Sequence, residues 1–130
     1  MNKRVLGICA AVLLSVGVAT PAGAASAAEP PYDILTMGQG TKLLGIVYEH
    51  ENFTGSRIEF RGESCTGRAD GLPDYQFPLG DKWRWRISSV ENKLCNQMGL
   101  RDRNGTNLAI GGSQKRLGWW NDQTVTVQFS

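Results

Sequence analysis

The sequence predicts an all-β domain, a sandwich of two four-stranded units held by one disulfide. Three observations predict this fold class. Apolar and polar residues alternate with period two in several short segments, the chain contains 16 glycines, and a weak repeat relates its two halves. Period-two alternation is typical of strands with one buried face, and tight turns between strands often need glycine. After the N-terminal segment, we find no convincing helical period.

Residues 1–27 have the layout of a secretory signal peptide. Two cations precede an apolar run at 5–19, and a stretch of small residues then offers Ala-x-Ala cleavage points. The run is too short and wrongly flanked for a membrane-spanning helix. We therefore expect cleavage after Ala27, with Ala24 as the alternative, and a secreted, extracellular product without a membrane span.

Removal of the signal peptide changes the charge and the cysteine count. Two of the 14 Lys and Arg residues leave with it, so 12 cations face 12 carboxylates. A net charge near zero gives no reason to expect a nucleic-acid partner. Cys9 leaves as well, and Cys65 and Cys95 remain as an even pair in an oxidising compartment. This predicts a disulfide between them.

The strands are expected after a loosely ordered leader at 28–42, which is rich in proline and glycine. Alternation predicts strands at 43–49, 56–60, 83–90 and 124–129. The side chains expected on their buried faces are Ile58, Phe60, Trp83, Trp85, Ile87, Val125, Val127 and Phe129. The dipeptide Asn104-Gly105 predicts a hairpin with a type I′ turn, since that turn needs positive φ at both positions.

The repeat relates two pairs of segments at different offsets. Residues 48–60 lie over 98–110 at an offset of 50, with Gly55 and Gly105 both at a turn. Residues 84–90 lie over 121–127 at an offset of 37. The first copy therefore carries about 13 extra residues, within 62–82. Because neither unit can bury its own face, the two are expected to stack into one sandwich.

The stretch YEHENFTG at 48–55 carries a family resemblance. Its spacing is an aromatic residue, four residues, Phe, one residue and Gly, and Ser88-Ser89 follows downstream. Together these resemble the Greek-key motif of the βγ-crystallin superfamily. The second copy departs from the motif, with Met98 in place of the aromatic and Arg103 in place of Phe.

A small secreted version with a disulfide looks most like the streptomycete metalloprotease-inhibitor family. The resemblance covers about residues 43–130. It implies a βγ-crystallin-like sandwich of two four-stranded Greek-key motifs, motif one at about 43–92 and motif two at about 93–130. Fold transfers more safely than function, because one sandwich hosts many activities.

The resemblance also implies a calcium site in each motif, written Asn/Asp-Asn/Asp-x-x-Ser/Thr-Ser. The first copy, 84–89, keeps both serines but has lost both acidic or amide positions, and the second, 121–126, keeps that pair but has lost the hydroxyl at Val125. What remains is a degenerate hybrid site of Ser88, Asn121 and Asp122, beside two arginines that repel a divalent ion. We expect no required cofactor and at most one weak calcium ion; alternatively, these residues serve only strand and turn.

The sequence offers little for catalysis. His50 is the single histidine, which excludes a two-histidine zinc site and leaves one candidate base. Its neighbours Glu49 and Glu51 would point to the opposite face of a strand. We find no glycine-rich phosphate loop and no CxxC pair. We therefore expect a binding protein and not an enzyme.

The favoured function is inhibition of an extracellular metallopeptidase by the long connection 62–81, which the disulfide would hold rigid. Preorganisation lowers the entropic cost of association. The residues expected to contact the protease are Cys65, Thr66, Arg68, Leu72, Tyr75 and Phe77. Alternatively, Tyr75 and Phe77 close the end of the sandwich.

A second hypothesis is a secreted toxin or antifungal module that binds cell-wall polysaccharide or anionic membrane. Four tryptophans and the pair Arg84 and Arg86 favour it, because aromatic rings stack on sugars and cations meet phosphates. Trp119 or Trp120 is the better exposed candidate, since neighbours on a strand cannot both face the core. A third hypothesis is a calcium-stabilised structural protein. We expect a monomer in each case.

Overall fold

The computed structural model describes residues 32–67 and 70–130, so the predicted signal peptide lies outside the described residues. Within these ranges, no helix has the length and apolar character needed to cross a membrane. The strands are β1 (Ile34–Met37), β2 (Lys42–His50), β3 (Thr54–Gly62), β4 (Tyr75–Pro78), β5 (Ser89–Asn92), β6 (Met98–Arg101), β7 (Asn107–Ile110), β8 (Ser113–Gln114) and β9 (Thr126–Phe129). Two short 3-10 turns, η1 (Glu51–Phe53) and η2 (Gly118–Trp120), complete the elements.

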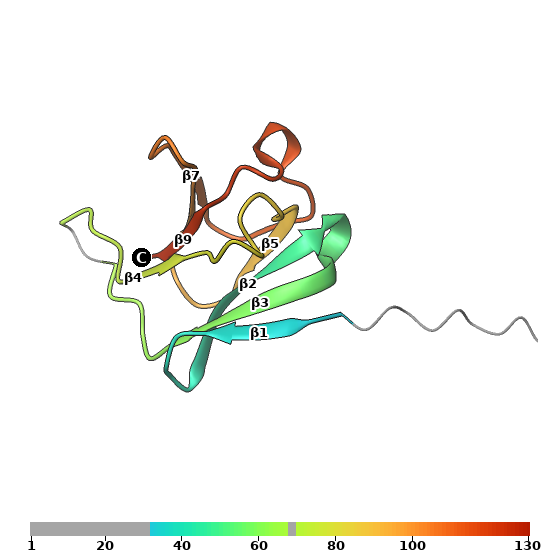
Figure 1. Ribbon diagram of the computed structural model, residues 1–130. Helices are drawn as coiled ribbons and strands as arrows, with labels where there is room; N and C mark the ends of the chain where they lie inside the picture. The colour runs from blue at the N-terminus through green and yellow to red at the C-terminus, as the bar shows by residue number, and fades with distance from the viewer. Residues whose placement is uncertain (1–31, 68–69) are drawn as a thin grey trace, which may run out of the picture.

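The strands form two sheets that pack face to face (Figure 1). The first sheet has the order β1-β3-β2-β5-β8 and the second the order β4-β9-β6-β7. In each motif the fourth strand returns to lie beside the first, as β5 does beside β2 and β9 beside β6, which is Greek-key connectivity. The predicted fold class, two four-stranded Greek-key motifs in one sandwich, is confirmed.

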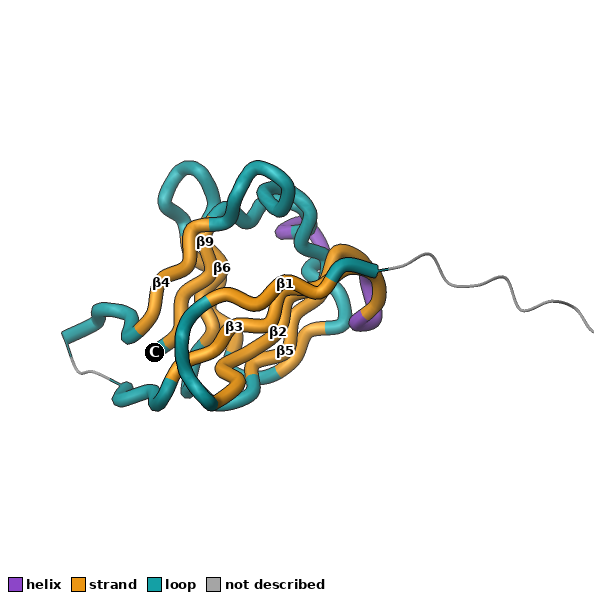
Figure 2. The backbone as a smooth tube through the Cα atoms, turned by 60° about the horizontal axis from the view of Figure 1, so that its bottom comes forward, coloured by secondary structure: helices purple, strands orange, loops and turns teal. Residues whose placement is uncertain are grey.

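Each motif lends its third strand to the other motif's sheet. Strand β4 of the first motif pairs with β9, and β8 of the second motif pairs with β5 (Figure 2). Neither motif can therefore complete a sheet alone. This exchange explains why the two copies in the sequence form one domain with one core.

The core lies between the two sheets. Its largest fully buried side chains include Ile58 and Phe60 from β3 and Val127 and Phe129 from β9, as the alternation predicted. Val125 is only half-buried. A Cβ atom on Gly45 would lie 2.8 Å from the Phe129 ring and 2.8 Å from the Glu91 carbonyl oxygen. The sheets therefore approach each other too closely at this point for any larger residue.

The expectation of a loosely ordered leader is wrong over part of 28–42. Residues 34–37 form β1, which pairs in parallel with β3, and β2 already begins at Lys42. Gly38, at φ 88°, makes the turn between them. The run Ile-Leu-Thr-Met consists of residues that suit an extended strand once β3 offers an edge for pairing.

The predicted strand at 83–90 is also wrong in its first half. Residues 81–85 form a turn, in which the N–H groups of Trp83 and Arg84 donate to the Gly80 carbonyl at 2.9 and 3.0 Å. Trp85 has a φ of 67° and is 42% exposed, whereas Trp83 and Ile87 are buried. Regular pairing begins only at Ser89.

The hairpin at Asn104-Gly105 exists, but its turn is not type I′. Five residues separate β6 from β7, and of the two turn residues only Gly105 has positive φ, at 84°. The carboxylate of Asp102 accepts hydrogen bonds from the N–H groups of Asn104 and Thr106, both at 2.8 Å, and this closes the longer loop. Gly55 has a φ of 83°, so the two glycines that the repeat aligned share one conformation.

Candidate functional site

The connection between β3 and β4, residues 63–74, is the candidate site and is called here the β3–β4 loop. It projects beyond the end of the sandwich in both backbone views (Figures 1 and 2). The structure describes its residues 63–67 and 70–74. It is shorter than the predicted connection 62–81, because 75–78 form β4.

Two covalent or hydrogen-bonded links hold the stems of the loop. The disulfide between Cys65 and Cys95, which the sequence predicted, ties the first stem to the segment before β6. The N–H and hydroxyl groups of Thr66 donate to the two carboxylate oxygens of Asp74 at 2.8 and 2.5 Å, a pair of contacts called here the Asp74 bridge. The Asp74 N–H donates to the Phe129 carbonyl at 2.8 Å, so the second stem is tied to β9.

Tyr75 and Phe77 lie under the loop in β4. Both are partly buried against the core, and their rings stack at 6.2 Å between centroids. The Tyr75 hydroxyl oxygen accepts hydrogen bonds from the N–H groups of Glu63 and Ser64 at 3.0 and 3.3 Å. These contacts favour the interpretation that the two aromatic residues close the sandwich and support the loop from below.

The part of the loop that faces solvent is small and mixed in character. Thr66 is exposed, and Leu72 is 61% exposed, although large apolar side chains are normally buried. The Leu72 N–H donates to the Asp70 carboxylate at 3.0 Å, which fixes the backbone at this point. Arg68, also expected to contact a protease, lies outside the described residues.

The predicted hybrid calcium residues are brought together only in part. Ser88 and Asp122 line a polar pocket of about 240 Å³, with Glu49, His50, Trp85 and Arg86. Asn121 does not line this pocket. Its amide nitrogen donates to the Asp122 carboxylate at 2.8 Å, and its amide oxygen is buried without a partner among the described residues.

The residues of this pocket do not fit a calcium ion. The Arg86 guanidinium forms an ion pair with Glu49 inside the pocket, so a positive charge already occupies it. The Ser88 hydroxyl donates to the Glu49 carbonyl at 2.8 Å and is committed as a donor. Calcium needs six to eight oxygen ligands, and among the described residues no three His, Cys, Asp or Glu side chains gather to hold a metal.

Asp122 gives the pocket a testable pH dependence. Desolvation raises the pKa of its carboxyl group, against the opposing charges of Arg86 and His50. A raised folded-state pKa means that ionised Asp122 opposes folding at neutral pH, and that this cost disappears as pH falls through that pKa. We expect Asp122→Asn to raise the unfolding free energy at pH 7 by no more than about 0.5 kcal/mol, since the residue is exposed and its φ of 57° also suits Asn.

Urea unfolding of both proteins at pH 7 and at pH 3 checks this expectation. The small advantage of the Asn variant should vanish at the lower pH, where the native carboxyl is protonated as well. A variant that is less stable by more than about 1 kcal/mol at pH 7 would contradict it, since such a loss would mean that the ionised carboxylate stabilises the fold.

The arginines of the polysaccharide hypothesis are occupied by contacts within the protein. Arg84 donates to the Leu79 carbonyl at 3.0 Å and forms an ion pair with Asp81 at 3.5 Å, and Arg86 pairs with Glu49. Trp119 is 80% exposed while its neighbour Trp120 is buried, which confirms that the two do not both face the core.

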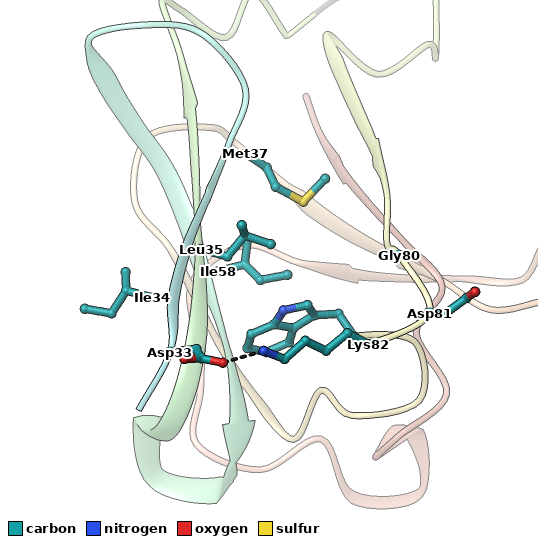
Figure 3. A pocket seen from close by; sticks show the side chains of 9 residues that line it. Asp33, Ile34, Leu35, Met37, Ile58, Gly80, Asp81 and Lys82 are labelled. Atoms are coloured by element: carbon teal, nitrogen blue, oxygen red, sulfur yellow. Dashed lines mark hydrogen bonds and ion pairs between the residues drawn. The ribbon is translucent and has the colours of Figure 1, made fainter. Parts of the chain in front are cut away.

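An apolar pocket of about 410 Å³ was not predicted. It lies between β1 and the turn at 80–83 (Figure 3), and Leu35, Met37, Ile58 and Trp83 form its apolar wall. An ion pair between Lys82 and Asp33 crosses one side of it. Sequence reasoning missed the pocket because β1 was expected to be loosely ordered; its signal was the β-forming run between two prolines and Gly38.

Comparisons with known proteins give little beyond the fold. No protein-family model matches the chain, and no curated protein matches it. Among solved structures, the N-terminal domain of protein S is similar, with a TM-score of 0.47 and 16% sequence identity over 65% of this chain and 91% of that one. Since this likeness is weak, the fold described above rests on the strand pairing and the function on the residues of this chain.

Proposed function

We propose that the protein is a secreted binding module that inhibits an extracellular metallopeptidase through the β3–β4 loop. The observation that carries the proposal is a projecting loop with both stems tied down and an exposed leucine between them. A loop held in one shape loses little conformational entropy on binding, which favours tight association. The family resemblance of the sequence points to the same class of target.

The two links also favour resistance to cleavage. Hydrolysis adds water across a peptide bond, giving a carboxylate on one side and an amine on the other. A cut between residues 66 and 74 would leave the first new end held by the disulfide and the Asp74 bridge, and the second held by β4. Ends that cannot move apart leave the enzyme slowly, as an inhibitor requires.

Titration against a thermolysin-type metallopeptidase tests the proposal, with a serine peptidase as the specificity control. We expect Leu72→Ala to weaken inhibition at least tenfold, because it removes the apolar side chain that the loop presents. Trp119→Ala removes an equally exposed apolar side chain from another surface and should leave inhibition unchanged. Absence of inhibition by the native protein at micromolar concentration, together with absence of a complex by size-exclusion chromatography, would refute the proposal.

Asp74 is expected to decide how long inhibition lasts. Asp74→Ala removes the Asp74 bridge while the disulfide stays, so the loop should loosen and be nicked by the enzyme at least ten times faster. Mass spectrometry of the complex over time measures the nicked fraction, alongside recovery of peptidase activity. Asp102→Ala is the matched control, because the Asp102 carboxylate closes the β6–β7 loop in a similar way. Equal nicking of the two variants would contradict this role.

The exposed ring of Trp119 favours a second candidate function, binding of cell-wall polysaccharide. A pull-down of the native protein on chitin and on cell-wall preparations tests it. We expect any retention to disappear in Trp119→Ala and to persist in Leu72→Ala, the reverse of the pattern for inhibition. Retention that survives Trp119→Ala would rule this tryptophan out.

A further inference from the structure

Strand β1 leaves one edge of the first sheet open within the described part of the chain. It pairs only with β3, at the end of the order β1-β3-β2-β5-β8. The Asp33 carbonyl accepts from the Arg57 N–H at 3.0 Å, so residue 33, and by alternation residues 35 and 37, direct their backbone groups toward β3. The N–H and C=O groups of Ile34 and Thr36 therefore point toward the open edge.

This edge lacks the devices that usually protect one. Edge strands of natural proteins are commonly blunted by charged residues, by proline within the strand or by a bulge. β1 has the sequence Ile-Leu-Thr-Met, without a charge or a proline, and pairs with β3 in an unbroken register. Ile34 and Leu35 are 57% and 42% exposed. The edge is thus chemically ready to accept a further strand.

The apolar pocket opens beside this edge on the inner side of the sheet. In Figure 3 the Leu35 side chain points toward Ile58 in the pocket, whereas Ile34 points away from it. Ile58 and Trp83 are buried and form its floor. A strand added to β1 would place the residue opposite Leu35 on the same face as Leu35, and so at the pocket.

We propose that β1 and the apolar pocket form a binding site for an extended peptide, which adds to the sheet as a strand and inserts one aromatic side chain. Four backbone hydrogen bonds to Ile34 and Thr36 would hold the peptide, and the pocket would select its central residue. The available area argues against a second copy of this chain as the occupant. A stable protein–protein interface buries about 1,200 Å² or more, and an edge of four residues with one pocket is too short to supply it.

Peptide titrations monitored by NMR test the site. The probe is the blocked pentapeptide acetyl-Thr-Thr-Phe-Thr-Thr-amide, added to the isotope-labelled protein. We expect saturable shift changes at Leu35 and Ile58 and at the Trp83 indole, at sub-millimolar to millimolar peptide. The same peptide with a central Ala should bind at least tenfold more weakly. Equal binding of the two peptides, or no shift change at these residues, would overturn the proposal.

Two glycines provide a matched pair of variants. A Cβ atom on Gly80, at the pocket wall, or on Gly112, in the loop before β8, meets no other atom within 4 Å. Neither backbone is in the positive-φ region. Gly80→Leu should therefore block the pocket without disturbing the fold and weaken peptide binding at least tenfold, while Gly112→Leu should bind as the native protein does. Full affinity in Gly80→Leu would contradict insertion into this pocket.

A proline at the open edge tests the hydrogen bonds separately. The Thr36 N–H points away from β3, so Thr36→Pro removes a donor that the incoming strand needs and leaves the pairing with β3 intact. We expect at least a tenfold loss of peptide affinity with an unchanged dispersion of the protein spectrum. If sedimentation shows a stable dimer of the native protein that Thr36→Pro abolishes, the occupant is a second copy and the peptide assignment is wrong.

Discussion

Replacing Cys65 and Cys95 together by alanine is expected to lower the unfolding free energy by about 2–5 kcal/mol and to remove peptidase inhibition. The disulfide spans 30 residues, and cross-links of this length stabilise small secreted domains by that amount. Cys95 is buried in the core cluster and Cys65 packs against it, so the two alanines also leave a small void. The same change frees the first stem of the β3–β4 loop.

Stability and inhibition should respond differently to this change. Urea unfolding gives the loss of free energy, and titration of the peptidase at a temperature where the variant is still folded gives the loss of affinity. Restored stability without restored inhibition is expected in a second protein, in which a Gly112→Ala change is the backbone control for the double variant. A folded double variant that inhibits as tightly as the native protein would contradict the proposed role of the loop.

The strands that sequence patterns located are those whose pattern is local. Ile58 and Phe60 alternate with charged residues within one short segment, and this alternation requires a single buried face whatever the partner strand is. Gly55 and Gly105 could be matched because both need positive φ at the same place in a motif. Such features depend on the residues nearby and were therefore predictable.

Trp85 shows why one strand was placed wrongly. Trp83 and Ile87 are four residues apart, a spacing that puts two side chains on the same face of a strand and also on the same side of a helical turn. Only the residue between them distinguishes the two structures, and an exposed tryptophan is unusual. The choice depends on where the main chain of 80–84 finds hydrogen bonds, which the local pattern does not specify.

The candidate sites depend on contacts between distant segments. Strand β1 exists because β3 offers it an edge, and the apolar pocket exists because the turn at 80–83 lies across from β1. The Asp74 bridge needs both stems of the loop to meet on the support of Tyr75. The cysteine pair was predictable from composition and compartment, but the tie between Thr66 and Asp74 was not.

Arg86 is the residue for which the structure most changes the meaning of the sequence, and its replacement should be costly. It occupies the metal-site segment of the first motif, and its guanidinium pairs with Glu49, whose side chain is only 15% exposed. Arg86→Met keeps the apolar stem and removes the charge, which leaves Glu49 partly buried without a counter-ion near Asp122. We expect a loss of about 2 kcal/mol in unfolding free energy. Arg84→Met is the matched control at about 0.5 kcal/mol or less, since its partner Asp81 is almost fully exposed.

Calcium separates this role from simple packing. With Arg86 in place, the pocket already holds a positive charge, so millimolar calcium should leave the melting temperature of the native protein unchanged. In Arg86→Met, the Glu49 and Asp122 carboxylates and the Ser88 hydroxyl line a pocket without that charge, and calcium should raise the melting temperature. A Glu49→Gln change added to Arg86→Met should recover most of the lost stability and abolish the response to calcium. If calcium stabilises the native protein as much as the variant, the arginine does not stand in for a metal ion, because the pocket would then accept calcium despite its charge.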